Sequence, residues 1–311
     1  MIRRNVLIFH SGGLGDFVLT WPLGLALGRL HPQSRIIYVT ASSKGELAAK
    51  ILRLDWMDAE SGWPALYSVA ATSATSLNDK CGKTLAEAHS VYTFLSTEAD
   101  AWSANVAATS PEAKLVSLRV APPVDFTGHV GDYLLSQLAG APAVRGAVEQ
   151  ILASIRNRGV GPVHVRGSSG PVFIHSGSGC RQKCYPLEAF IRLIERLKGN
   201  GKIPKVILGE VELERFADSE VRELERTAEV VRPARYVDLA DLLAGAAGFI
   251  GHDSGPGHLA GVIGVPTVAL FGPTDPAVWR PMGPKVQVVR GVELNVDAVC
   301  EALEQVLGVR E

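Results

Sequence analysis

The chain has 311 residues, of which 47% are hydrophobic and 20% charged, and its formal net charge at pH 7 is −1. This length is enough for two α/β domains with separate cores, and the near-neutral charge excludes a chain that holds nucleic acid or an anionic membrane through a strong positive field. Four cysteines are too few for a disulfide framework, and the apolar run after Arg4 is too short for a signal peptide or a membrane helix, so a cytoplasmic protein is expected.

The first 40 residues are predicted to form a strand, a helix and a second strand, the start of a parallel α/β layer. Residues 5–9 are a continuous apolar run that leads into a glycine cluster, as in a buried parallel strand. Residues 35–40 are the second strand. Between them, leucines recur at helical spacing until Pro32, at positions Leu19, Leu23, Leu27 and Leu30.

Residues 55–123 have weak periodicity. Three strands are predicted there, at 65–70, 90–95 and 114–120. A helix is predicted at 129–138. Residues 158–171 are dense in glycine and proline, which is typical of a linker, so we place the domain boundary in this stretch.

The second half alternates more regularly between strands and helices. Strands are predicted at 172–175, 205–208, 249–250 and 267–271. Helices are predicted from Pro186 to Gly199, from a cap at Asp238 through Ala247, at 256–263 and at 296–307. The pattern predicts an α/β fold of two Rossmann-like domains with parallel sheets, residues 1–160 and 161–311, whose last helix could pack back on the N-terminal domain.

The loop after the first strand, residues 11–16, is the first candidate site. Its glycines let the backbone come close to a ligand, and Asp16 projects from the loop or the first helical turn. Gly13 and Gly15 supply only the first pair of the dinucleotide pattern G-x-G-x-x-G, because Val18 stands where the third glycine belongs. Asp16 is either a catalytic carboxylate or a cap of the next helix.

The second candidate site follows the strand at 172–175. Residues 175–179 (His-Ser-Gly-Ser-Gly) form a loop, Lys183 follows, and a helix begins at Pro186. Free backbone N–H groups, the helix dipole and the lysine charge all favour a phosphate at such a place. The pattern therefore predicts a phosphate site.

The same stretch offers a metal site as an alternative. Its candidate ligands are His175, Cys180 and Cys184. Three candidates within ten residues and no second pair do not make the usual zinc pattern, so we predict no metal and no cofactor.

The third candidate site is the segment 251–258, again between a strand and a helix. Asp253 could accept hydrogen bonds from a sugar, while Ser254 and Gly255 face a phosphate. His258 lies one helical turn after Ser254 and could approach the same ligand, or it could be a core histidine bonded to backbone. Ligands of open α/β sheets bind beyond the carboxyl ends of the strands, so the three loops could converge on one cleft between the domains.

A long pattern extends from the third site and carries a family resemblance. It comprises residues 253–260 (Asp-Ser-Gly-Pro-Gly-His-Leu-Ala), 264–266 (Gly-Val-Pro) and 270–276 (Leu-Phe-Gly-Pro-Thr-Asp-Pro). In this stretch the chain resembles glycosyltransferase family 9, which contains the ADP-heptose:lipopolysaccharide heptosyltransferases. The opening loop with residues 20–22 (Thr-Trp-Pro) and the loop at 175–186 also match the family's pattern.

The resemblance implies a GT-B fold, in which two Rossmann-like domains face a central cleft, with the acceptor in the N-terminal domain and the sugar nucleotide mainly in the C-terminal one. It also implies inverting, metal-independent transfer of a heptose from ADP-heptose to a lipopolysaccharide inner-core acceptor. The protein would then be cytoplasmic or peripheral at the inner membrane, with no nucleic-acid partner.

The resemblance also implies roles for individual residues. Asp16 is the expected general base, on an acceptor loop that includes Gly13 and Gly15. The expected donor-binding residues are Ser178, Gly179 and Lys183 for the diphosphate, and Asp253, Ser254, Gly255 and His258 for the sugar and phosphates.

The chain departs from the family's pattern at three places that bear on specificity. Ser176 stands where proline is usual, Cys184 and Tyr185 replace an Arg-Trp pair, and Gly257 replaces a larger residue. The alternatives therefore include another sugar nucleotide, a protein or glycan acceptor, and a non-catalytic sugar-nucleotide-binding protein. A nicotinamide-dependent oxidoreductase would share the domain type but needs the third glycine of the dinucleotide pattern.

Overall fold

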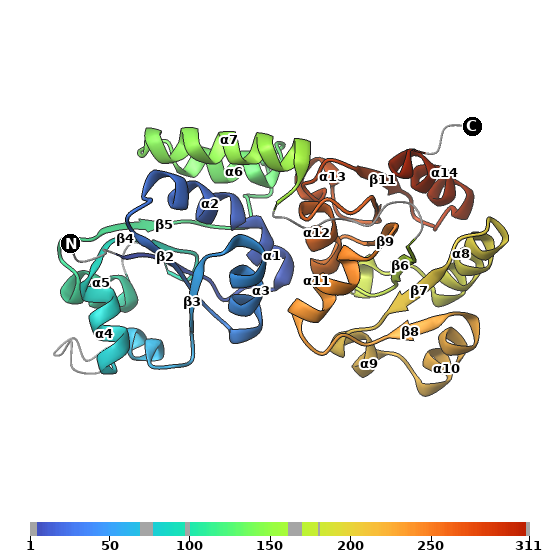
Figure 1. The fold of residues 1–311 in the computed structure, drawn as a ribbon, viewed down its shortest axis with the longest axis horizontal. Coiled ribbons are helices and arrows are strands. Elements are labelled where there is room, and N and C mark those ends of the chain that lie inside the picture. Colours follow the sequence, from blue (N-terminus) through green and yellow to red (C-terminus); the bar gives the residue numbers. More distant parts are fainter. Residues whose placement is uncertain (1–4, 69–76, 97–99, 161–169, 180, 309–311) are drawn as a thin grey trace. The chain divides into compact units, whose positions relative to one another are not determined.

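The computed structural model describes residues 5–68, 77–96, 100–160, 170–179 and 181–308 (Figure 1). Its contacts divide the chain into two compact units. The N-terminal unit comprises Met1–Phe126 and Val130–Leu152, and the C-terminal unit comprises Thr127–His129 and Ala153–Glu311. Within the described ranges, no helix combines the length and the apolar character needed to cross a membrane.

The N-terminal unit is built on a five-stranded parallel sheet of order β3-β2-β1-β4-β5. Its elements are β1 (Asn5–Phe9), α1 (Leu14–Leu19), α2 (Trp21–Leu30), β2 (Arg35–Thr40), α3 (Ser42–Leu52), β3 (Asp55–Asp58), the 3₁₀ helix η1 (Trp63–Tyr67), α4 (Asp79–Ala86), β4 (Ala88–Thr93), α5 (Ala101–Thr109), β5 (Lys114–Ser117), α6 (Val130–Gln137) and α7 (Pro142–Arg158), whose last turns belong to the other unit. All five residues of the central strand β1 are buried, as a strand covered on both faces requires.

Aromatic side chains fill one side of this sheet. Phe9 of β1 meets Trp63 and Trp102 edge to face, with ring centroids 5.1 and 4.9 Å apart. Burial of these large rings fixes the end of β1, from which the first candidate loop leaves.

The C-terminal unit is built on a six-stranded parallel sheet of order β11-β10-β9-β6-β7-β8. Its elements are β6 (Val172–His175), the 3₁₀ helix η2 (Arg181–Lys183), α8 (Leu187–Gly199), β7 (Pro204–Ile207), α9 (Glu210–Arg215), α10 (Asp218–Thr227), β8 (Glu229–Val231), α11 (Tyr236–Ala244), β9 (Gly248–His252), α12 (Gly255–Val262), β10 (Thr267–Phe271), α13 (Pro276–Trp279), β11 (Val286–Arg290) and α14 (Val296–Leu307). Alternate strand residues form one core with α8, α10 and α14. The candidate loops leave the carboxyl ends of β6 and β9, which are neighbours.

Most of the predicted elements are confirmed, including the α/β class with parallel sheets. The strand predicted at 65–70 is wrong, because residues 63–67 form η1, and residues 69 and 70 lie outside the described ranges. Trp63 and Leu66 are both buried, and their i, i+3 spacing serves a helical turn better than a strand. The strand predicted at 114–120 ends at Ser117, where its partner strand β4 also ends.

Two helices in the second half also bear on the predictions. The helix predicted to be capped by Asp238 begins at Tyr236, so Asp238 occupies its first turn and accepts a hydrogen bond from the backbone N–H of Arg235. The last helix, α14, buries Val299 and Leu303 in the core of the C-terminal unit, and the expectation that it could also pack on the N-terminal domain stays a prediction. The 17-residue helix α7 was not predicted.

Candidate functional site

Asp16 lies in the first turn of α1, at the carboxyl edge of the N-terminal sheet. Gly13, and not Asp16, occupies the cap position of this helix, which corrects the alternative that Asp16 is itself the cap. The residue is half-buried. Gly15 lies in the same turn. The acceptor role predicted for this loop stays a prediction.

The Asp16 side chain folds back over Gly12. A Cβ atom at Gly12 would lie 3.0 Å from Asp16 Oδ2 and 3.1 Å from His10 Cε1. These separations are tighter than ordinary van der Waals contacts, so only a glycine lets the carboxylate sit here without displacement.

Lys44, which the sequence analysis did not single out, joins α3 to the same loop. Its Nζ donates hydrogen bonds to the carbonyl oxygens of Ser11 at 3.3 Å and Gly12 at 2.5 Å. Burial lowers the pKa of Lys44, while the negative charge of Asp16 raises it. The signal that could have marked Lys44 is its place in the first turn of α3. The helix dipole disfavours a cation there unless negatively charged or carbonyl groups lie nearby.

In the C-terminal unit, the loop after β6 is held by α9. Arg215 donates hydrogen bonds to the carbonyl oxygens of Ser178 at 2.8 Å and Gly179 at 3.0 Å. Glu212 lies against Gly177, where an added Cβ would collide with Oε1 at 1.8 Å. Neither Arg215 nor Glu212 stood out in the sequence, because both belong to a helix rich in exposed charged residues.

Lys183, Asp253 and His258 form one cluster at this edge of the sheet. Lys183 Nζ donates to Asp253 Oδ2 at 2.6 Å, and His258 Nε2 lies 3.5 Å from Asp253 Oδ1. The Asp253 side chain is only 6% exposed, whereas that of Lys183 is 27% exposed. Burial raises the pKa of Asp253, but the hydrogen bonds and charges of His258 and Lys183 outweigh burial and lower the pKa below its ordinary value. The carboxylate is therefore ionised at neutral pH.

The other donor residues predicted from the sequence surround this cluster. Ser178 Oγ donates to the carbonyl oxygen of Asp253 at 3.2 Å. Ser254 is the cap of α12, which Gly255 begins, and its side chain makes no capping hydrogen bond. Ser254 Oγ instead lies 3.5 Å from His175 Nδ1. The structure thus brings the predicted donor-binding side chains together beside an uncapped helix start.

His252 ties the two loops of the C-terminal unit together, and the sequence analysis gave it no role. Its Nε2 accepts a hydrogen bond from the backbone N–H of Tyr185 at 3.0 Å, so its Nδ1 is the donor to the carbonyl oxygen of Gly177 at 3.3 Å. Burial lowers the pKa of His252 to about 4, against the weaker opposing effect of the bond to Gly177. The ring is therefore neutral at pH 7.

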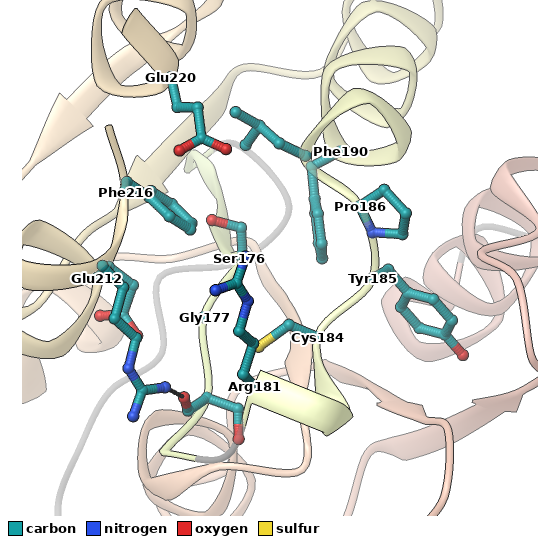
Figure 2. Close-up of a pocket in the computed structure, with 13 residues that line it drawn as sticks. Ser176, Gly177, Arg181, Cys184, Tyr185, Pro186, Phe190, Glu212, Phe216 and Glu220 are labelled. Atoms are coloured by element: carbon teal, nitrogen blue, oxygen red, sulfur yellow. Dashed lines mark hydrogen bonds between the residues drawn. The ribbon is translucent and has the colours of Figure 1, made fainter. Parts of the chain in front are cut away.

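A pocket of about 250 Å³ is lined by residues 176–178 of the loop after β6 and by residues of α8, α9 and α10. Figure 2 shows Phe190 and Phe216 on its opposite sides with the Ser176 hydroxyl between them. The Ser176 Oγ has no hydrogen-bond partner among the described residues. Ser176 and Cys184, two of the departures from the family's pattern, both line this pocket.

The alternative metal site receives no support from the part of the chain that the structure describes. No group of three metal-binding side chains is found within the described ranges. Cys180, one of the three candidate ligands, lies outside them. Within those ranges His175 instead faces a carboxylate, with its Nε2 3.5 Å from Glu212 Oε2.

Comparison with known proteins places the chain near one family. Residues 166–305 match the sequence model of "Glycosyltransferase family 9 (heptosyltransferase)", which confirms the resemblance for this part of the chain. Lipopolysaccharide heptosyltransferase 3 of Escherichia coli K12 is 30% identical over 102 residues, and lipopolysaccharide heptosyltransferase 1 of Pseudomonas aeruginosa is 34% identical over 105 residues. These alignments cover 32% and 34% of this chain but only 30% and 29% of those relatives.

Solved structures resemble the chain over nearly its whole length. A family 9 glycosyl transferase from Veillonella parvula superposes with a TM-score of 0.68 at 17% identity, covering 99% of this chain and 98% of its own. The E. coli heptosyltransferase WaaC with ADP superposes with a TM-score of 0.64 at 17% identity, covering 97% and 99%. At this identity the likeness speaks for the fold, and it confirms the predicted GT-B fold of two Rossmann-like domains.

The neutral state of His252 predicts a pH-dependent stability. Because its folded pKa of about 4 lies below the unfolded value of about 6.5, the unfolded chain binds more protons between these values. The stability that the neutral His252 ring contributes to the folded state is complete above pH 6.5 and is lost as the pH falls toward 4. Urea unfolding should show that wild type loses about 2 kcal/mol more unfolding free energy than His252→Gln when the pH falls from 7 to 5. An identical pH dependence in wild type and variant would contradict this prediction.

Proposed function

We propose that the protein is an inverting glycosyltransferase that uses a nucleoside-diphosphate sugar as donor. The observation that carries the proposal is the Lys183–Asp253–His258 cluster beside the uncapped start of α12, within the stretch that matches the family's sequence model. Cationic donors and free N–H groups around one point suit a diphosphate, and a buried carboxylate beside them suits sugar hydroxyls.

In this proposal the donor is ADP-heptose and the acceptor a lipopolysaccharide inner-core sugar, bound from the cytoplasmic side of the inner membrane. The support is the function named for the curated relatives and the ADP in the WaaC structure. The specificity for donor and acceptor would differ from that of the relatives at three positions, Ser176, Cys184 and Gly257.

The proposed reaction is a direct displacement at the anomeric carbon. Asp16 accepts the proton of the acceptor hydroxyl while that oxygen attacks, and the bond to the diphosphate breaks with its electron pair leaving on the phosphate oxygen. Attack opposite the leaving group inverts the anomeric centre. Lys183, oriented by Asp253, stabilises the charge on the leaving diphosphate with its remaining N–H donors.

A panel of ligands tests the proposed function directly. Bound nucleotide stabilises the folded state as its concentration rises above Kd, so the melting temperature should rise with ADP and ADP-heptose. Isothermal titration would then rank ADP against UDP and GDP. No shift with any nucleoside diphosphate or sugar nucleotide would sink the proposal.

Lys183→Met should raise the Kd for ADP at least about tenfold, because a charge on the diphosphate is lost. Lys205→Met is the matched control, since Lys205 pairs with Glu229 away from the cluster. Removing Lys183 also leaves Asp253 buried with one partner fewer, so the melting temperature of the ligand-free variant is measured beside the Kd to separate a general loss of stability from a loss of binding. ADP affinity within twofold of wild type in Lys183→Met would contradict the role.

Asp16→Asn should lower kcat by at least about 10², the lower end of general-base contributions, because the amide cannot accept the proton. The Kd for ADP should stay within about twofold, since the proposed donor residues lie in the C-terminal unit. Asp125→Asn, at an exposed loop position, is the control. Near-native turnover in Asp16→Asn would remove Asp16 from the mechanism.

Chelation tests the metal-independent character of the proposed reaction. Turnover should be unchanged after dialysis against EDTA, because the proposal assigns leaving-group stabilisation to Lys183 and helix N–H groups. Activity lost in EDTA and restored by a divalent ion would reopen the site at His175, Cys180 and Cys184.

A further inference from the structure

A cation holds each of the two glycine loops by two successive carbonyl oxygens. In the N-terminal unit, Lys44 binds the carbonyl oxygens of Ser11 and Gly12. In the C-terminal unit, Arg215 binds those of Ser178 and Gly179. Both loops follow the first strand of their unit, and both are the loops from which ligand contacts are expected.

The two cations occupy the same topological place. Strand β2 pairs with β1 and is followed by α3, which carries Lys44. Strand β7 pairs with β6 and is followed by α9, which carries Arg215. Each loop is therefore held by the helix that follows the neighbouring strand, although the two cations differ in type and in their position on the helix.

Such a bond fixes the direction in which the loop's amides point. A trans peptide is planar, and its C=O and N–H point to opposite sides. When a cation binds the carbonyl oxygens of Ser11 and Gly12, the N–H groups of Gly12 and Gly13 point away from Lys44. The same geometry turns the N–H of Gly179 away from Arg215. Preset amides avoid the free-energy cost of ordering a glycine loop when a ligand binds.

In the N-terminal unit the constraint extends to Asp16. The Asp16 carboxylate rests on Gly12, whose carbonyl oxygen Lys44 holds. Lys44 is buried and stands in the first turn of α3, near the positive end of the helix dipole, where a cation is disfavoured. The bonds to the loop and the charge of Asp16 offset this cost, which ties the position of Lys44 to that of the loop.

We propose that Lys44 and Arg215 are positioning residues that preform the two loops, Lys44 for the base Asp16 and Arg215 for the donor diphosphate. This inference rests on the proposed function. The two residues act on different steps, so their loss should separate in the kinetics: Lys44 supports turnover, and Arg215 supports donor affinity.

The test compares Lys44→Met and Arg215→Met with two control variants that lose an exposed ion pair, Arg35→Met in the N-terminal unit and Lys205→Met in the C-terminal unit. Lys44→Met should lower kcat at least about tenfold with the ADP Kd within twofold. Arg215→Met should raise the ADP Kd at least about fivefold. Lys44→Arg and Arg215→Lys, which keep a donor cation, should recover most of each loss.

Two results would overturn the inference. One is a wild-type-like kcat in Lys44→Met together with a wild-type-like ADP Kd in Arg215→Met. The other is a parallel loss of kcat and affinity in both variants that simply follows a fall in melting temperature, as a general structural role would give.

Backbone order parameters separate this inference from the proposed function. The amide order parameters at residues 11–13 and 177–179, measured by NMR relaxation with no ligand present, should be close to about 0.85 in the control and fall below about 0.6 in the corresponding Met variant. If the wild-type protein binds no nucleotide but the order parameters differ as expected, the proposed function fails and the loop-holding role stands. Equal order parameters in variant and control overturn the loop-holding role, whatever the protein binds.

Discussion

The arrangement of the C-terminal unit depends on the buried carboxylate of Asp253. An ionised group removed from water needs partners, because removing one partner of such a pair costs about 3–5 kcal/mol. Lys183 and His258 supply the partners and keep the carboxylate charged. The need to satisfy one charge therefore brings η2 to the end of β9 and the first turn of α12, two neighbouring segments that lie far from η2 in the sequence.

Around this charge the remaining polar groups hold the loop after β6 from both sides. His252 at the end of β9 donates a hydrogen bond to the carbonyl oxygen of Gly177, while Glu212 and Arg215 hold the loop from α9, the helix that follows β7. The neutral state of His252 is essential to this arrangement, because its Nε2 accepts a hydrogen bond only when unprotonated. These contacts hold the loop through protein groups alone, which suits the proposed binding of an anion whose charge must be met by directed N–H groups.

Much of the fold could be predicted from the sequence, because its signals are local. The apolar run at residues 5–9 and the leucine spacing of α2 report burial within one element, and glycine-rich loops after strands mark the ligand edge of a parallel sheet. The same local signals led to Lys183, Asp253 and His258, which the structure joins in one cluster. Prediction failed where tertiary burial outweighed a local pattern, as at residues 63–67, where Trp63 and Leu66 favour a 3₁₀ turn.

The sequence by itself determined the class of fold, the order of most elements and the positions of the glycine-rich loops at which we propose the ligand contacts. Only the tertiary structure decided how those loops are held. No sequence motif marks the three side chains that hold the loops, Lys44, Arg215 and His252. Each of them hydrogen-bonds to backbone carbonyl or N–H groups, which nearly every residue possesses. Such contacts are set by which helix lies beside which strand end, and not by residue type or spacing. The pairing of β1 with β2 and of β6 with β7 is what brings these side chains to the loops.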